Sequence, residues 1–161
     1  MDAKTVTRLR TVIGRLARDL NATATNEGLT PTQASVLGLV SGRGPIGLAE
    51  LNELEGLNPT LLSRVVSKLE ELGLIERVPD PADLRTANVA VTTAGQSVHE
   101  RIRDARADII SDCMTRLPKR SVSSLIAALP ALEELSAQVR LTAAGKPNQT
   151  SPRLRVTSAA P

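Results

Sequence analysis

The side chains best suited to contact another molecule lie in one short segment of this sequence, residues 58–73. The segment starts like a helix, because Asn58 can cap free backbone N–H groups and Pro59 suits the first helical position. N–H groups at such a start attract phosphate oxygens. The exposed face of this helix would carry small hydroxyl groups and a guanidinium that can bind guanine O6 and N7 in a DNA major groove. These side chains are Thr60, Ser63, Arg64 and Ser67, with Lys68 at the flank.

The opposite face of this predicted helix is apolar and is expected to be buried, and Gly73 ends the helix. Two short runs rich in β-branched residues, 74–78 and 87–91, then predict a β-hairpin with a long polar tip. Arg85 in that tip suits the negative potential of a narrow minor groove, and Asp83 can hold its guanidinium in one rotamer. The apolar face of the helix consists of Leu62, Val65, Val66, Leu69 and Leu72.

Three helices are predicted before this segment: a long N-terminal one and two shorter ones. An apolar stripe at helical spacing predicts that long helix over residues 4–25. Residues 30–33 form a capping box with proline at the first helical position, and the helix they start is expected to run to about Val40. A short helix over residues 48–55 follows, and Gly56 ends it.

The C-terminal part of the chain predicts two more helices. Thr92 caps a long one, and Pro118 marks the corner before the other. That last helix is expected over residues 119–142, with Pro130 kinking or splitting it, and the chain from residue 143 is expected to be disordered. The apolar stripe of the helix after Thr92 consists of Val98, Ile102, Ala105, Ile109 and Cys113.

The order of these elements predicts a winged helix-turn-helix. Three helices followed by a β-hairpin place the third helix in a major groove and the hairpin, or wing, at an adjacent groove. The predicted fold is therefore mainly α-helical with a small β-hairpin wing, flanked by long N- and C-terminal helices.

Four motifs in this order resemble the MarR family of transcription regulators. Residues 57–77 resemble the recognition helix and first wing strand of that family, and residues 80–85 resemble its Asp-Pro-x-Asp-x-Arg wing. Residues 91–95 resemble the Leu-Thr-x-x-Gly start of its next helix, and residues 29–33 the Leu-Thr-x-x-Gln opening of its second helix. The resemblance extends over about residues 4–142.

The resemblance implies an obligate homodimer that represses transcription from a pseudo-palindromic operator in double-stranded DNA. Such repression is often relieved by a small-molecule effector or by cysteine oxidation. Motif by motif, Ser63 and Arg64 would touch bases or phosphates, Arg85 would enter the minor groove, and Asp83 would orient it. The predicted DNA-contacting set is Asn58, Thr60, Ser63, Arg64, Ser67, Lys68, Arg77, Asp83 and Arg85.

This sequence departs from the family pattern at two positions. Leu84 stands where the usual wing has an arginine, and Ala34 stands where many members have an aromatic residue. The first departure removes one expected phosphate contact.

The expected organisation has four parts. Residues 1–28 form an N-terminal dimerisation helix, residues 29–92 the DNA-binding segment, residues 93–142 the C-terminal dimerisation helices, and residues 143–161 the tail. The apolar stripes of the first and last helices exceed what one small winged domain covers, so we expect a second copy to bury them. The alternative is that these helices pack back on their own winged domain. The expected dimerisation residues are Val6, Leu9, Ile13, Leu125, Leu129, Leu132 and Leu135.

Composition narrows the possible functions of the 161 residues. The chain has no Phe, Trp or Tyr, which excludes base stacking on aromatic side chains and predicts an aliphatic pocket for any effector. Its one His and one Cys cannot form a usual metal site, and no phosphate-binding or nucleophile motif is present, so neither a cofactor nor an enzyme is expected. No signal peptide or membrane-spanning stretch is recognisable, and we expect a cytoplasmic protein that binds no membrane.

The distribution of charge along the sequence is compatible with a second function. The net charge of +3 equals the charge of residues 144–161 alone, whereas residues 31–92 carry five basic and eight acidic groups. A winged-helix protein-interaction module with little DNA binding is therefore the alternative. Two single residues also have two interpretations each: Cys113 is a small hydrophobe or a redox switch, and His99 lies at the surface or lines a ligand pocket.

Overall fold

The computed structural model describes residues 2–80 and 87–144. The tip of the predicted wing and the predicted disordered tail, apart from its first two residues, lie outside this part of the chain. Helix α6 continues through those two residues, to Ala144. The elements in chain order are α1 (Ala3–Asn26), α2 (Pro31–Arg43), β1 (Ile46–Gly47), α3 (Leu48–Glu55), α4 (Pro59–Glu71), β2 (Ile75–Pro79), β3 (Ala87–Val91), α5 (Thr93–Thr115) and α6 (Lys119–Ala144).

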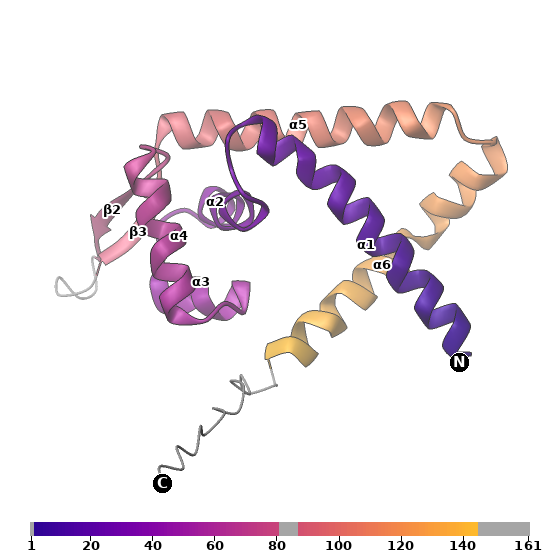
Figure 1. Ribbon diagram of the computed structural model, residues 1–161, viewed down its shortest axis with the longest axis horizontal. Coiled ribbons are helices and arrows are strands. Elements are labelled where there is room, and N and C mark those ends of the chain that lie inside the picture. Colours follow the sequence, from indigo (N-terminus) through magenta and orange to yellow (C-terminus); the bar gives the residue numbers. More distant parts are fainter. Residues whose placement is uncertain (1, 81–86, 145–161) are drawn as a thin grey trace, which may run out of the picture.

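The molecule has a small winged part and a long helical part (Figure 1). Helices α2, α3 and α4 gather with the sheet at the start of α5, and α6 folds back from the far end of α5. Helix α1 packs against α2 and α5. The mainly helical fold with a small antiparallel sheet confirms the predicted fold class.

The wing is an antiparallel sheet with strand order β1-β3-β2 among the described residues. Strands β2 and β3 pair from Ile75 opposite Val91 to Pro79 opposite Ala87, as the predicted hairpin requires. Strand β1 was not predicted, because two residues are too few to show a period. It adds to the sheet by pairing Ile46 with Val89.

The core lies in the winged part and is made of aliphatic side chains. Leu37 and Val40 of α2, Leu51 of α3 and Leu69 of α4 are fully buried, and Val89 brings the sheet onto them. Because α2 ends where Gly44 turns with φ of 77°, it is longer than predicted and includes Arg43. The prediction that Leu72 is buried is wrong: it caps the end of α4 and is 45% exposed.

The long helices are solvated over most of their length. Ile102 of α5 is buried, but Ile109 and Cys113 on the same predicted stripe are exposed. Helix α6 passes through Pro130 as one helix, so it is not split there. Proline lacks the N–H that would bond to the carbonyl of Ile126, and that part of α6 faces solvent.

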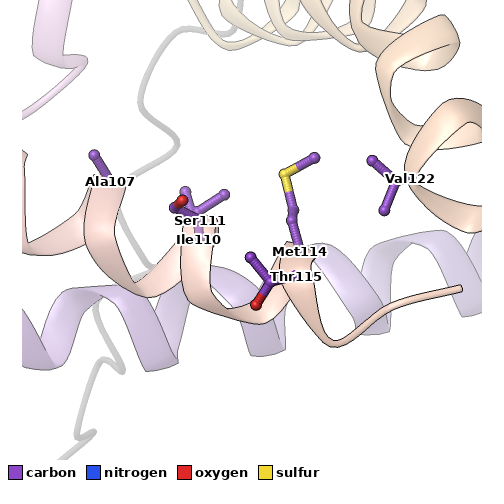
Figure 2. A pocket seen from close by; sticks show the side chains of 6 residues that line it. All are labelled: Ala107, Ile110, Ser111, Met114, Thr115 and Val122. Carbon is purple, nitrogen blue, oxygen red and sulfur yellow. The ribbon is translucent and has the colours of Figure 1, made fainter. Parts of the chain in front are cut away.

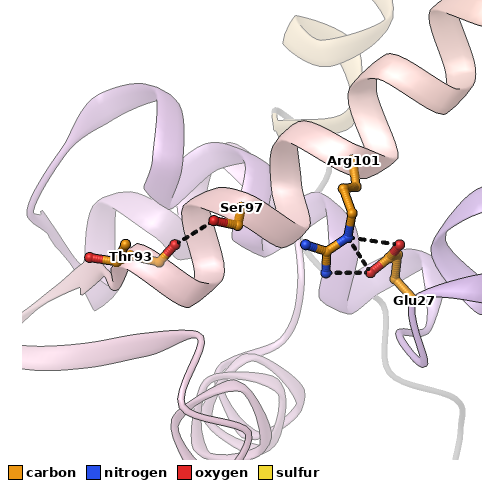
Figure 3. Close-up of polar contacts among 4 residues, drawn as sticks. All are labelled: Glu27, Thr93, Ser97 and Arg101. Atoms are coloured by element: carbon orange, nitrogen blue, oxygen red, sulfur yellow. Dashed lines mark hydrogen bonds and ion pairs between the residues drawn. The ribbon is translucent and has the colours of Figure 1, made fainter.

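Two arginines of α5 form hydrogen bonds with the C-terminal end of α1. Arg101 donates three hydrogen bonds of 2.7–3.1 Å to the carboxylate of Glu27, just after the end of α1 (Figure 3). These bonds hold the pKa of the Glu27 carboxyl below its ordinary value, against a smaller opposing effect of burial. One turn on, Arg106 donates to Thr23 Oγ1 at 3.2 Å. The end of α1 is thereby fixed, while its first part extends beyond the winged core.

The wing joins α5 through a tight junction. Thr92 donates its N–H to the Leu74 carbonyl at 3.1 Å and its hydroxyl to the Gly73 carbonyl at 2.7 Å. The same hydroxyl accepts the Gly95 N–H at 3.0 Å and so caps α5. A Cβ on Gly95 would overlap the Leu74 carbonyl oxygen, so glycine is required for this approach. The Leu-Thr-x-x-Gly resemblance therefore has a steric basis.

Candidate nucleic-acid interface

Helix α4 presents a continuous polar surface opposite the core. Leu62, Val66 and Leu69 are buried on its other face, and α4 packs against α2 and β2, which fixes its rotation. The polar side chains at helical spacing on the outer face are all exposed, where the sequence predicted them. We refer to this set as the α4 row, and it consists of Thr60, Ser63, Arg64, Ser67 and Lys68.

The N-terminus of α4 has fewer free donors than the sequence indicates. Asn58 caps the helix by accepting the Leu61 N–H on Oδ1 at 2.8 Å, and its carbonyl accepts the Leu62 N–H at 3.0 Å. Pro59 has no N–H to offer. Among the described residues of this helix start, the backbone donors left for a phosphate are therefore the N–H groups of Asn58 and Thr60, and side chains must supply most of the binding chemistry.

Most cations of the winged part are already paired with carboxylates. Lys68 bonds to Glu71 at 2.9 Å, and Arg43 lies 3.3 Å from Glu50. Arg64 is the one Lys or Arg of residues 31–80 with no ion pair among the described residues. Its charge is therefore the one most available to a ligand of the α4 row.

Arg77 on β2 is occupied by Glu70 of α4. Its Nε and Nη2 donate to the two carboxylate oxygens at 3.0 and 3.2 Å. Glu70 is only 27% exposed, so this pair is better shielded from water than the Lys68 pair. The pair connects the wing to the recognition helix. Sequence reasoning placed Arg77 among the DNA contacts but missed this partner, seven residues away across a turn.

The described part of the wing ends short of its predicted contacts. Asp83, Leu84 and Arg85 lie outside the described residues. The register places Pro79 opposite Ala87 at the last pair, and β2 packs against α4. The stem of the wing is therefore held against α4.

Residues 29–87 match the model described as the MarR family. The matched residues are those of the winged part. The match confirms the resemblance to the MarR family predicted from the sequence, and the fold confirms the predicted winged helix-turn-helix.

Relatives of this protein are named as transcription regulators. Mb0904 of Mycobacterium bovis, an uncharacterized HTH-type transcriptional regulator, is 26% identical over 134 residues, which are 80% of this chain and 94% of that protein. The HTH-type transcriptional repressor MdtR of Bacillus subtilis is 21% identical, with coverage of 71% and 74%. The crystal structure of RV1404 from Mycobacterium tuberculosis has a TM-score of 0.73 at 27% identity, covering 83% of this chain and 94% of that one.

The helices outside the winged part expose a broad apolar surface. On α1, Val6, Leu9 and Ile13 are 41–48% exposed. No described residue of α6 is buried. A hollow of about 630 Å³ lies in the bend between α5 and α6, where Met114 and Val122 project toward each other (Figure 2). The expected dimerisation residues on α6 are also 38–51% exposed: Leu125, Leu129, Leu132 and Leu135.

The two single residues with open roles lie on α5. Cys113 is exposed, and neither of its two interpretations is tested by this position on α5. His99 is half-buried and lies against Gly38 of α2. A Cβ added to Gly38 would lie 3.3 Å from Cε1 of the His99 imidazole. Burial, more than the nearby Arg103, lowers the pKa of this imidazole below its ordinary value. Neither residue contacts the α4 row.

Other site types have no support in the described residues. Within residues 2–80 and 87–144, no three His, Cys, Asp or Glu side chains come together as metal ligands would. None of the helices described there has a stretch long and apolar enough to cross a bilayer.

Proposed function

We propose that this protein is a MarR-family repressor that binds a pseudo-palindromic operator in double-stranded DNA as a homodimer, in the cytoplasm. The observation that carries the proposal is the α4 row, in which Arg64 has no ion pair among the described residues. The printed names of Mb0904 and MdtR, a transcriptional regulator and a transcriptional repressor, support it.

In this proposal α4 and the wing contact different grooves of the DNA. Helix α4 enters the major groove, and Arg64 binds the O6 and N7 of a guanine. The hydroxyls of Thr60, Ser63 and Ser67, and the ammonium of Lys68, bind neighbouring bases and phosphates. The amide of Asn58 lies at the helix start, where a phosphate passes.

The wing supplies the remaining predicted contacts. In this proposal Arg85 enters a minor groove and Asp83 orients it, although neither lies in the described residues. Because Arg77 is bound to Glu70, it sets the angle between wing and α4, and its phosphate contact is secondary. Residues 29–92 form the DNA-binding segment.

The flanking helices provide the dimer. Residues 1–28 and 93–142 are proposed to join two copies, and the exposure of leucines on α1 and α6 supports this. Two recognition helices then reach two half-sites about 34–36 Å apart. A small-molecule effector fits the same scheme. A hollow of about 440 Å³ between α3 and α6 has an aliphatic lining from Leu54, Ala137 and Leu141 that suits an aliphatic ligand, with the charged groups of Glu53, Glu55 and Arg140 beside it.

Arg64→Ala is expected to weaken specific DNA binding by about 1–3 kcal/mol and to relax sequence choice at one position of each half-site. The test is a fluorescence-anisotropy titration of a duplex that the pure protein selects from a random library. The matched control is Arg116→Ala, which removes the same charge at the far end of α5, where Arg116 pairs with Asp112. An equal loss of DNA affinity in both variants would mean that Arg64 contributes only positive charge and does not contact a specific base.

The alternative function, a protein-interaction module, is favoured by the acidic charge of the winged part. Salt dependence separates the two. About four phosphate contacts per dimer predict a loss of affinity of about a hundredfold between about 50 and 200 mM salt, because counterions are released. No DNA binding at low salt, with a folded protein, would support the interaction module and contradict the repressor.

A further inference from the structure

Leu61 is a large apolar side chain exposed in the first turn of the recognition helix. Large exposed hydrophobic side chains of the described residues lie on α1, α5, α6 and the corner at Leu117, with two exceptions in the winged part. Leu72, 45% exposed, lies at the end of α4, away from the first turn. Leu61, 41% exposed, lies within the α4 row's own first turn.

The fold holds Leu61 in place without using its side chain. Its N–H is bound to the Asn58 cap at 2.8 Å, so its backbone position is fixed. The positions that form a hydrophobic staple at this helix start are Leu57 and Leu62, which pack in the core. Neither capping nor core packing therefore accounts for an isobutyl group that faces outward here.

The neighbours of Leu61 are the residues proposed to read DNA. Thr60 precedes it, and Arg64 is one turn further along, at the i, i+3 spacing that brings Cβ atoms to about 5–6 Å. N-terminal residues of a recognition helix are the ones that reach base edges. In the major groove the base edges display one apolar group, the C5-methyl of thymine.

We propose that Leu61 is a specificity-determining residue that contacts the C5-methyl of a thymine within about two base pairs of the guanine bound by Arg64. The inference rests on the proposed function, in which α4 enters the major groove. It adds an apolar contact that prefers A·T over G·C at one position of each half-site. Cytosine presents no methyl group there, and its partner guanine presents only polar acceptors.

The experiment replaces each thymine of the selected duplex by deoxyuridine, one at a time. Deoxyuridine pairs with adenine as thymine does and lacks only the C5-methyl group. For the unmodified protein, one replacement per half-site is expected to weaken binding about fourfold, the value of one buried methyl-sized group, with the other replacements neutral. Leu61→Ala is expected to bind the thymine and deoxyuridine duplexes equally at that position.

The control variant is Leu72→Ala, which shortens the other exposed leucine of the winged part and should keep the fourfold preference. The inference is overturned if the unmodified protein binds the duplex but tolerates every deoxyuridine, a result that needs no variant to fold. It is also overturned if Leu61→Ala keeps the preference. In both cases the proposed function stands, whereas failure to bind any duplex at low salt would overturn the proposed function itself.

Discussion

Replacing Gly95 by alanine is expected to destabilise the fold by at least about 3 kcal/mol. The new Cβ would overlap the Leu74 carbonyl oxygen and lie 2.8 Å from the Leu74 carbonyl carbon and 3.0 Å from Val91 Cγ2. The Leu74 backbone cannot yield easily, because its N–H donates to the Leu69 carbonyl at 2.9 Å and its carbonyl accepts from Thr92. Relief therefore requires the wing and α5 to separate, which exposes the buried Ile75 and Val89.

The measurement is the free energy of unfolding in urea, followed by circular dichroism. The matched control is Gly42→Ala, the same change at an exposed position of α2 with no atom within 4 Å of the new Cβ. Helix propensity predicts that this control is neutral or stabilises by up to about 1 kcal/mol. Equal midpoints for Gly95→Ala and the parent would show that α5 does not approach the wing as closely as described.

The winged part could be predicted from the sequence because its signals are local. The Thr30–Gln33 capping box, the Asn58 cap and the Thr92 cap all appear as hydrogen bonds between residues three apart. The apolar period of α4 was also right for Leu62 to Leu69, all of whose predicted members are buried. A helix that carries its own caps and its own buried face needs no information from distant segments.

The features that sequence reasoning missed depend on distant segments. Strand β1 is defined only by its antiparallel pairing with β3, in which Ile46 lies opposite Val89. The Arg77–Glu70 pair depends on the turn after α4, which brings β2 back against that helix. The hydrophobic periodicity of the sequence contains no information about this turn. Leu72 keeps the helical apolar spacing but lies at the cap, where no other element covers it. Amphipathic spacing predicts which face is apolar, and the partner decides whether it is buried.

In the long helices, too, the sequence predicts the apolar face but not whether another element buries it. Their stripes were predicted, but the described chain covers only the segments beside the winged part, such as Ala24 and Ile102. The alternative in which α1 and α6 pack back on their own domain would bury their apolar stripes, but Leu9 and Leu16 of α1 and the leucines of α6 are exposed. A partner must cover them if they are to be buried, and the proposed partner is a second copy.

Leu129→Asp is therefore expected to convert the proposed dimer to a monomer. Leu129, 51% exposed, lies in the middle of the apolar stripe of α6. Two-fold symmetry places the new carboxylate in the interface twice. The desolvation of unpaired charges is expected to cost at least about 4 kcal/mol, which raises the dimer dissociation constant about a thousandfold. Sedimentation equilibrium measures this constant directly.

The matched control is Ala127→Asp, which introduces the same charge on the other side of α6, about 160° around the helix from Leu129. It should leave the dimer intact. DNA binding supplies a second readout, because a monomer reaches one half-site at a time and loses the affinity gained by linking two recognition helices. Leu129→Asp should then bind the selected duplex far more weakly, although its Arg64 is unchanged. A parent protein that is monomeric at micromolar concentration, or a Leu129→Asp variant that stays dimeric, would contradict the proposed dimer and the two-half-site operator with it.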